Sequence, residues 1–445
     1  MSPYQGYAYG YPHKLAYRPL DPALSLKEVW RDEPRDSLFL YVHIPFCEMR
    51  CGFCNLFTTA NPAEGMVSAY LDALDRQLDL TQRAFEATGS DKPKFARAAL
   101  GGGTPTFLSP GELERLYAML ERTWGSLSNT PWSVEMSPAT VTAEKLQFLL
   151  SRGMRRASIG VQSFLSSETR SLGRAQDPSE LHQALSLMRN SGVRALNIDL
   201  IYGAEGQTPA TWLQSLNRAM EYAPEELYLY PLYVRPLTGL GKRAGDSVEV
   251  LDPRPGLYQI ACEFLLARGY RQISMRLFRA GHYPDASGPE YCCQEDGMLG
   301  LGAGARSYTR STHYSTEYAV GRPDVQSILR HYIEEYSGGS ASNIVADPGA
   351  VTYGIVLNDH EQQRRYVIKS LLRSDGLNMA QYASRFGAPA LGHFPQLAEL
   401  EELQLALRER DYLRLTSRGL GLSDAIGPWL YSYSIRKLME SYELS

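Results

Sequence analysis

The 445-residue sequence has no uninterrupted apolar run of about 18 residues, the length that a membrane-spanning helix requires. Its first residues, from Met1 to Tyr7, lack the basic and apolar regions of a secretory signal peptide. Lys and Arg are dispersed and the net charge is only −4, which indicates neither a nucleic-acid surface nor a polybasic membrane patch. We therefore expect a cytoplasmic protein that acts on neither nucleic acid nor membrane.

Cysteine is also scarce, and three of the six cysteines lie within eight positions, so a disulfide framework is not expected. Cys47, Cys51 and Cys54 follow the apolar run from Leu38 to Ile44 at C-x3-C-x2-C spacing. Three thiolates without a fourth Cys or His close behind suit a [4Fe–4S] cluster with one open iron. A structural zinc site is the weaker alternative, because it needs four ligands and the next cysteine is Cys262.

The chain is long enough for a domain of roughly 250 to 300 residues and a smaller appended one. From Leu38 to about Val234, short apolar runs alternate with longer amphipathic segments, which is typical of βα units around a parallel sheet. The expected strands span 38–44, 95–100, 132–136, 157–161, 195–201 and 226–233, and the expected helices span 66–87, 110–124, 143–152, 178–191 and 209–222. Six units predict an α/β fold, an incomplete (β/α)6 barrel, whose ligand site lies at the carboxyl ends of the strands.

Residues suited to ligand binding follow several of these strands. Three glycines precede Thr104 and allow the backbone to approach a ligand closely. Gln162 ends the fourth strand, where an amide suits ribose hydroxyls, and Arg174 suits a carboxylate. Asp199 is the only charge in an apolar run, and a ligand hydroxyl would offset the cost of burying it.

The string Tyr41-x-His43-Ile-Pro-Phe-Cys47-x3-Cys51-x-Phe-Cys54 resembles the signature of radical S-adenosylmethionine (SAM) enzymes. In particular it is similar to the branch that contains the oxygen-independent coproporphyrinogen III oxidases, the haem chaperones and the class C radical SAM methylases. The resemblance covers roughly residues 37 to 310. It implies the same open barrel, a [4Fe–4S] cluster held by the three cysteines, and SAM bound at the open iron.

The resemblance also implies roles for single residues. Gly102, Gly103 and Thr104 lie in a segment that receives the SAM amino group, and Glu135 contacts SAM. Gln162 contacts the ribose, Arg174 the methionine carboxylate, and Asp199 a further part of SAM. Tyr41 and His43 lie beside SAM as candidate catalytic residues, with a structural role for His43 as the alternative. Some relatives bind a second SAM near the first.

The segment Tyr291-Cys292-Cys293 departs from the family pattern, because haem chaperones place Tyr-Trp there. Cys292 and Cys293 are candidate proton or hydrogen-atom donors, and inert packing is the competing and favoured interpretation. The glycines that follow, Gly300, Gly302 and Gly304, are expected to line the substrate cavity.

We predict four parts of the chain. Residues 1–36 form an arm without helical or strand period, either packed on the surface or closing the active site, where His13, Lys14 and Arg18 would meet an acidic substrate. Residues 37–310 form the core barrel, and residues 311–359 form a loop-rich connector. Residues 360–445 form a helical, winged-helix-like domain that serves as a lid or support.

The predicted function is that of a monomeric radical SAM enzyme, which cleaves SAM reductively to start radical chemistry on a small conjugated or tetrapyrrole-like substrate. Methyl or methylene transfer is the preferred interpretation, because of the unusual Cys292-Cys293 segment. The alternatives are oxidative decarboxylation of coproporphyrinogen III and a haem chaperone without turnover. The enzyme would require an electron donor such as flavodoxin or ferredoxin.

Overall fold

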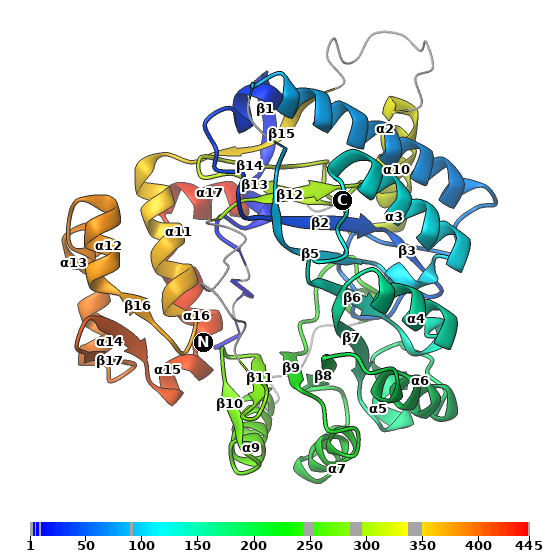
Figure 1. Ribbon diagram of the computed structural model, residues 1–445. Coiled ribbons are helices and arrows are strands. Elements are labelled where there is room, and N and C mark those ends of the chain that lie inside the picture. The colour runs from blue at the N-terminus through cyan, green and yellow to red at the C-terminus, as the bar shows by residue number, and fades with distance from the viewer. Residues whose placement is uncertain are drawn as a thin grey trace.

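A 13-stranded mixed sheet dominates the computed structural model, in the order β1-β15-β14-β13-β12-β2-β5-β6-β7-β8-β9-β11-β10. The sheet curves into an open barrel with helices on its outer side, and a helical domain lies beside its open edge (Figure 1). The structure describes residues 3, 4, 6–8, 10–89, 92–243, 252–284, 296–336 and 349–443. No helix within these ranges is both long and apolar enough to cross a membrane.

The centre of the sheet is parallel, as the βα pattern predicts. Its strands are β2 (Leu38–Ile44), β5 (Phe95–Gly102), β6 (Trp132–Met136), β7 (Met154–Gln162), β8 (Ala195–Tyr202) and β9 (Glu226–Pro231). β12 (Met298–Leu301) adds a further parallel strand beside β2. The expected incomplete barrel is therefore confirmed, and its sheet does not close on itself.

The helices between these strands begin where their capping residues lie. They are α2 (Met66–Glu86), α3 (Pro110–Trp124), α4 (Ala143–Ser151), α5 (Ser166–Ser171), α6 (Pro178–Asn190) and α7 (Pro209–Met220). Ser109 and Thr208 form capping boxes with a proline at the first helical turn. Gly153 and Gly192 adopt left-handed backbone conformations after helices α4 and α6.

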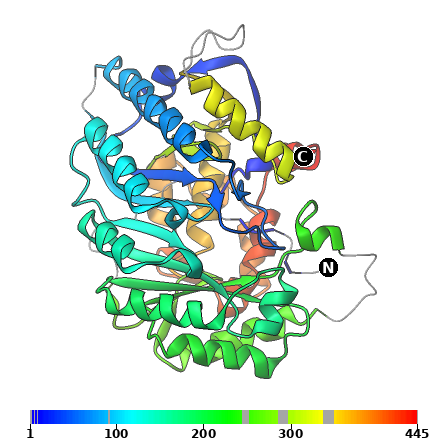
Figure 2. The same cartoon turned by 90° about the vertical axis from the view of Figure 1, so that its right-hand side faces the viewer.

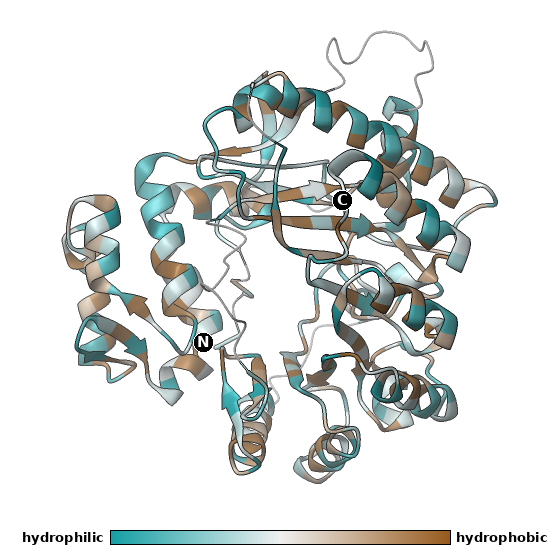
Figure 3. Cartoon of the chain, viewed as in Figure 1, coloured by the Kyte–Doolittle hydropathy of each residue, from teal (hydrophilic) through white to brown (hydrophobic). Residues whose placement is uncertain are grey.

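The two faces of the sheet bury different residues. Leu40 and Val42 of β2 are fully buried in the core beneath the outer helices, whereas Tyr41 and His43 face the interior of the barrel beside the glycine loop. Hydrophobic and hydrophilic residues are interspersed along the outer helices, as in amphipathic helices that bury one side (Figure 3). The barrel interior is thus lined by polar groups, and the hydrophobic core lies outside it.

The amino-terminal arm is structured, which corrects the expectation of an arm without regular elements. It contains η1 (Lys14–Ala16), β1 (Arg18–Ser25) and α1 (Leu26–Trp30), and β1 pairs antiparallel with β15 (Ala350–Val356) at the edge of the sheet. Tyr11, Tyr17 and Trp30 are fully buried. The local pattern gave no strand signal because β1 contains two prolines and pairs with a distant segment.

The segment 311–359 was expected to be rich in loops but contains regular elements. β13 (Arg306–Tyr308), β14 (Thr312–Ser315) and β15 extend the sheet antiparallel from β12, and α10 (Arg322–Tyr336) packs against α2. At the other edge of the sheet lie β11 (Leu277–Ala280) and β10 (Tyr270–Gln272), which follow the helices α8 (Gly239–Arg243) and α9 (Arg254–Leu266) in the chain. Strands this short leave little periodicity in the sequence.

The carboxyl-terminal domain has its own core and the expected strand pair. Its elements are α11 (Asp359–Leu371), β16 (Leu377–Asn378), α12 (Met379–Phe386), α13 (Ala390–His393), α14 (Leu397–Glu402), β17 (Ala406–Glu409), β18 (Tyr412–Leu415), α15 (Ser417–Gly421), α16 (Ser423–Trp429) and α17 (Tyr433–Glu440). Ala8, Tyr11 and Ala16 of the arm belong to this core. The arm therefore joins the carboxyl-terminal domain to the barrel (Figures 1 and 2).

Candidate functional site

The loop that carries the three cysteines is closed at its base. β3 (Phe46–Cys47) pairs in parallel with β4 (Thr59–Ala60), so the intervening chain forms a loop directly after β2. The N–H of Gly52 donates to the carbonyl of Gly173 over 3.1 Å. A side chain at Gly52 would lie 2.8 Å from the carbonyl oxygen of Leu172, so the loop packs against the barrel only with glycine there.

The three predicted cluster ligands lie together, and each thiol has a polar neighbour. Thr104 Oγ1 donates to Cys47 Sγ over 3.6 Å, Arg174 Nη1 donates to Cys51 Sγ over 3.2 Å, and Cys54 Sγ lies 3.9 Å from the hydroxyl of Thr58. Burial raises the pKa of Cys47 to about 12, and the neighbouring thiol of Cys54 raises it as well. Thiols in this setting become thiolates when iron compensates their charge.

Within the described ranges, no three His, Cys, Asp or Glu side chains converge on a point where one metal ion would bind. A four-iron cluster does not require such convergence, because each thiolate binds a different iron. The arrangement of the cysteines therefore gives no support to the zinc alternative.

The glycine loop after β5 packs directly on the cysteine loop. Gly102 has a φ of 115°, and a side chain there would lie 2.6 Å from the imidazole of His43. A side chain at Gly103 would lie 2.6 Å from the carbonyl oxygen of Phe46 and 2.9 Å from Cys47 Sγ. These glycines bring the backbone next to the thiols, where its polar groups can meet a ligand of the cluster.

Glu135 projects from β6 into the interior of the barrel. Its Oε2 accepts a hydrogen bond from the N–H of Gly102 at 3.1 Å. The Glu135 side chain lies deep in the protein, and its surface is still accessible to solvent. It therefore lines a space inside the barrel. Burial raises the pKa of Glu135, and the Gly102 hydrogen bond acts in the opposite direction. The carboxylate thus faces an internal space with acceptor capacity left for a ligand.

Asp199 lies in a buried polar cluster with Asn197 and Ser158. Asn197 Nδ2 donates to Asp199 Oδ1 over 2.7 Å and to Ser158 Oγ over 2.8 Å. Burial raises the pKa of Asp199 to about 7, although Arg156 and the bond from Asn197 lower it. Asn197 Oδ1 is buried with no hydrogen-bond partner in the part of the chain that is described. An orphaned acceptor beside a half-ionised carboxylate fits a ligand that brings hydroxyl donors.

Gln162 and Arg174 follow β7 at the same end of the barrel. Gln162 has a φ of 68°, a left-handed conformation that costs energy for a residue other than glycine and is common at functional sites. Arg174 is held by bonds from Nη2 to the carbonyl of Gly160 at 2.8 Å and from Nε to Gln176 Oε1 at 3.0 Å. The guanidinium is therefore fixed beside Cys51 and retains N–H groups for a carboxylate.

The side chains of Tyr41 and His43 are hydrogen-bonded to each other between the barrel and the cysteine loop. Tyr41 OH donates to His43 Nδ1 over 3.3 Å, and His43 Nε2 donates to the carbonyl of Phe57 over 2.9 Å. Burial lowers the pKa of His43 to about 4, so the imidazole is neutral at physiological pH. Because both ring nitrogens have protein partners, the geometry favours a positioning role for His43.

Cys292 and Cys293 lie in the segment 285–295, outside the described residues. Their candidate role as donors therefore stays a prediction.

His13, Lys14, Arg235 and Arg306 lie near one another at the mouth of the barrel; Lys14 and the two arginines are the basic members, and His13 is neutral at physiological pH. We call these four residues the cationic group. Burial lowers the pKa of Lys14 well below its usual range, Arg306 and Arg235 lower it further, and Cys54 acts in the opposite direction. The pKa of His13 is lowered by burial and by the other three members. Lys14 Nζ lies 3.4 Å from the centre of the Tyr318 ring.

Arg18, which was expected to join His13 and Lys14, instead donates to the carbonyl of Leu438 and to Ser441 Oγ of the carboxyl-terminal domain. The sequence interpretation missed Arg235 and Arg306. Arg235 follows the end of β9, so the strand-end rule that found Gln162 would have found it. Arg306 begins an antiparallel strand beyond the repeat, where that rule does not apply.

Comparison with known proteins agrees with the geometry. The model of the Radical SAM superfamily matches residues 41–219, and the model of the HemN C-terminal domain matches residues 357–422. The oxygen-independent coproporphyrinogen III oxidase of Pseudomonas aeruginosa is 28% identical over 397 residues, which cover 87% of this chain and 82% of that protein. The heme chaperone HemW of Bacillus subtilis is 27% identical over 397 residues, covering 87% of this chain and 97% of that protein.

The solved structure of coproporphyrinogen III oxidase (HemN) from Escherichia coli has the same fold. It superimposes with a TM-score of 0.77 at 24% identity and covers 98% of both chains. The match includes the open barrel and the carboxyl-terminal domain.

Proposed function

The chain belongs to the radical SAM superfamily, in the branch that carries the HemN C-terminal domain, and we propose that it is an oxidase of the coproporphyrinogen III type. In this proposal it decarboxylates an acidic tetrapyrrole-like substrate oxidatively in the absence of oxygen: the radical that SAM would supply takes a hydrogen atom, the carboxylate leaves as CO2, and a one-electron acceptor takes the remaining electron. The preference for methyl or methylene transfer finds no support in the comparisons, whereas several relatives are coproporphyrinogen III oxidases.

The residues of the site fit the [4Fe–4S] cluster and SAM that the superfamily implies. When bound, the cluster and SAM supply the reductive cleavage that starts radical chemistry. Cys47, Cys51 and Cys54 would hold the cluster, and the backbone of the glycine loop would lie against SAM. The orphaned Asn197 Oδ1 and the raised pKa of Asp199 are observations of this structure that a hydroxyl-bearing ligand would relieve. A flavodoxin or ferredoxin would serve as the electron donor.

The single observation that carries the choice of substrate is the cationic group at the barrel mouth. Burial and the neighbouring positive charges lower the pKa of Lys14 and of His13, so a negatively charged group beside them is favoured. A substrate with several carboxylates supplies such anions and places them beside the cysteine loop, as the proximity of Lys14 to Cys54 indicates. A neutral substrate would bring no such charge.

The arm supports an enzyme rather than a chaperone. It contributes His13 and Lys14 to the mouth of the barrel and buries Tyr11 between the arm and the carboxyl-terminal domain. A closed mouth excludes water from radical chemistry.

The test is an anaerobic incubation of the protein, with its cluster reconstituted, with SAM, dithionite and coproporphyrinogen III. We expect products that have lost carboxyl groups, identified by mass spectrometry. Transfer of a methyl group to the substrate would support the methylase interpretation instead. Tight haem binding without any SAM cleavage would support the chaperone.

A variant pair tests the cationic group in the same assay. Lys14→Gln should raise KM for the substrate by about tenfold or more, because it removes one charge-assisted contact of roughly 1.5–3 kcal/mol. Lys27→Gln removes the same charge from an exposed position on α1 of the arm and should change nothing. Equal KM values for the two variants would contradict the assignment of the cationic group.

A further inference from the structure

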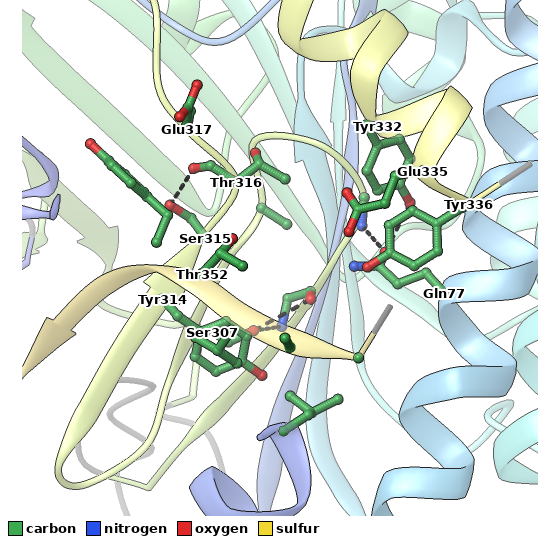
Figure 4. Close-up of a pocket in the computed structure, with 18 of the residues that line it drawn as sticks. Gln77, Ser307, Tyr314, Ser315, Thr316, Glu317, Tyr332, Glu335, Tyr336 and Thr352 are labelled. Carbon is green, nitrogen blue, oxygen red and sulfur yellow. Dashed lines mark hydrogen bonds between the residues drawn. The ribbon is translucent and has the colours of Figure 1, made fainter. Parts of the chain in front are cut away.

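A cavity lies outside the barrel, between α2, α10 and the antiparallel strands β13 to β15 (Figure 4). Its volume is about 540 Å³. Leu299, Ser307 and Tyr314 form part of its floor on the helix-covered side of the sheet, whereas Tyr41 and His43 face the barrel interior on the other side. The cavity is therefore separate from the proposed active site.

The charged groups that line this cavity are acidic. Among the described residues, its walls include the carboxylates of Glu317 and Glu335 and the imidazole of His331, but no Lys or Arg. The remaining polar groups are neutral hydroxyls and one amide. An anionic ligand would find no partner of opposite charge here apart from the exposed His331.

Glu335 is the central group of the cavity. It projects from α10 and lies next to the rings of Tyr332 and Tyr336 (Figure 4). Burial raises the pKa of its carboxyl, and His331 acts in the opposite direction. Within the described part of the chain, no hydrogen bond or ion pair engages this carboxylate. A half-buried carboxylate without a partner has a strong preference for a cation.

The aromatic wall is held in a fixed arrangement. Gln77 Oε1 accepts hydrogen bonds from the N–H of Gly302 at 2.7 Å and from Tyr332 OH at 2.9 Å. The rings of Tyr332 and Tyr336 lie 5.0 Å apart at an angle of 52°. Aromatic faces beside a carboxylate attract ammonium groups through their quadrupoles.

We propose that this cavity binds a small organic polycation of the polyamine class. Glu335 would receive one ammonium group beside the Tyr336 ring, and Glu317, an exposed residue on another side of the cavity, would receive a second (Figure 4). The hydroxyls of the walls would accept the remaining N–H donors. A neutral polyol would leave Glu335 uncompensated, and an acidic molecule such as the substrate proposed for the barrel would be repelled.

The experiment is isothermal titration of the full-length protein, with its cluster in place, at near-physiological salt. Spermidine is the probe, with triethylene glycol as the neutral comparator and citrate as the anionic one. We expect saturable binding of one spermidine per chain and none of the comparators. Binding of triethylene glycol as tight as that of spermidine, or no spermidine binding at all, would overturn the proposal.

Because the protein is acidic overall, spermidine could also gather on its surface, and a matched variant pair separates the two cases. Glu335→Gln should weaken spermidine binding at least tenfold. Glu334→Gln changes the net charge equally at the neighbouring, exposed position of α10 and should leave the affinity unchanged. If both variants bind spermidine equally more weakly, spermidine binds only through attraction to the acidic surface, and the cavity is rejected as the site.

Discussion

Arg276 of the barrel and Asp424 of the carboxyl-terminal domain form an ion pair that is almost fully buried, with side chains 4% and 1% exposed. The hydroxyl of Tyr233 also donates to the Asp424 carboxylate. The arm completes the contact, since the Arg276 guanidinium lies 3.7 Å from the centre of the Tyr7 ring and the N–H of Gly6 donates to the carbonyl of Asp424. Three distant parts of the chain therefore meet at one pair of charges.

Breaking this pair should be costly. Arg276→Met or Asp424→Asn leaves the other charged group buried without its partner, and we expect the free energy of unfolding to fall by about 3–5 kcal/mol. The double variant Arg276→Met/Asp424→Leu should recover much of that loss, because neither charge then remains. Urea unfolding followed by tryptophan fluorescence measures the changes.

The control for this pair is Arg218 and Glu221, an ion pair on the protein surface whose side chains are 57% and 54% exposed. Arg218→Met should cost less than about 1 kcal/mol, as exposed ion pairs do. If Arg276→Met costs no more than Arg218→Met, the buried pair does not stabilise the junction.

Replacing Cys47, Cys51 or Cys54 by Ala should abolish iron binding, because each thiolate is expected to hold one iron of a cluster of about four. Iron content and the visible absorption of anaerobically reconstituted protein measure the effect. Cys262→Ala is the matched control, since Cys262 lies on α9 and takes no part in the cysteine loop. A single variant of the three that retains the full cluster would contradict the ligand assignment.

SAM affinity should rise with pH through the titration of Asp199. Its pKa of about 7 lies above the usual value, so the folded chain holds this proton more tightly than the unfolded chain does. Ligand-free protein therefore loses stability as pH rises from about 4 to 7, while the ionised carboxylate gains acceptor capacity for SAM hydroxyls. Between pH 6 and 8 the ionised fraction increases about tenfold, and SAM affinity should follow it.

The variant Asp199→Asn tests whether the pH dependence of SAM affinity comes from the titration of Asp199. The variant should lose the pH dependence and bind SAM about tenfold to a hundredfold more weakly at pH 8, with the cluster intact. Equilibrium dialysis with labelled SAM measures both effects. An unchanged pH dependence in the variant would assign the titration to another group.

Trp30→Ala should destabilise the protein by about 3–5 kcal/mol. The Trp30 ring is fully buried against Phe85, and its Nε1 donates to Tyr314 OH over 2.8 Å. Trp429→Ala removes the same side chain from a position that is 37% exposed and should cost less than half as much. Thermal unfolding of both variants measures the difference, and equal losses would show that the arm contributes little to the core.

The sequence predicted the barrel well where structure is local. Ser109 and Thr208 are followed by a proline at the first helical position, and the helices begin there, because capping depends only on neighbouring residues. The structure places the predicted polar residues close together because the carboxyl ends of parallel strands meet at one edge of the sheet, and their roles stay predictions. The C-x3-C-x2-C spacing alone was enough to predict that the three thiols lie close together.

What the sequence could not predict depends on distant partners. Val351 pairs with Leu24, and neither segment shows a period that reveals the other. An arm that only lay on the surface could be deleted without loss, whereas deleting residues 1–30 would remove Trp30 from one hydrophobic core and Tyr11 from the other. Arg306 lies on β13, in the same antiparallel part of the sheet, and the βα repeat does not predict these strands.

The pairing of β1 with β15 also fixes an order of events on the ribosome. Arg18 lies opposite Gly354, which is synthesised 336 residues later. At about 5–20 residues per second, roughly 17 to 67 seconds separate the two partners. The first segment to leave the ribosome is thus among the last to reach its final position.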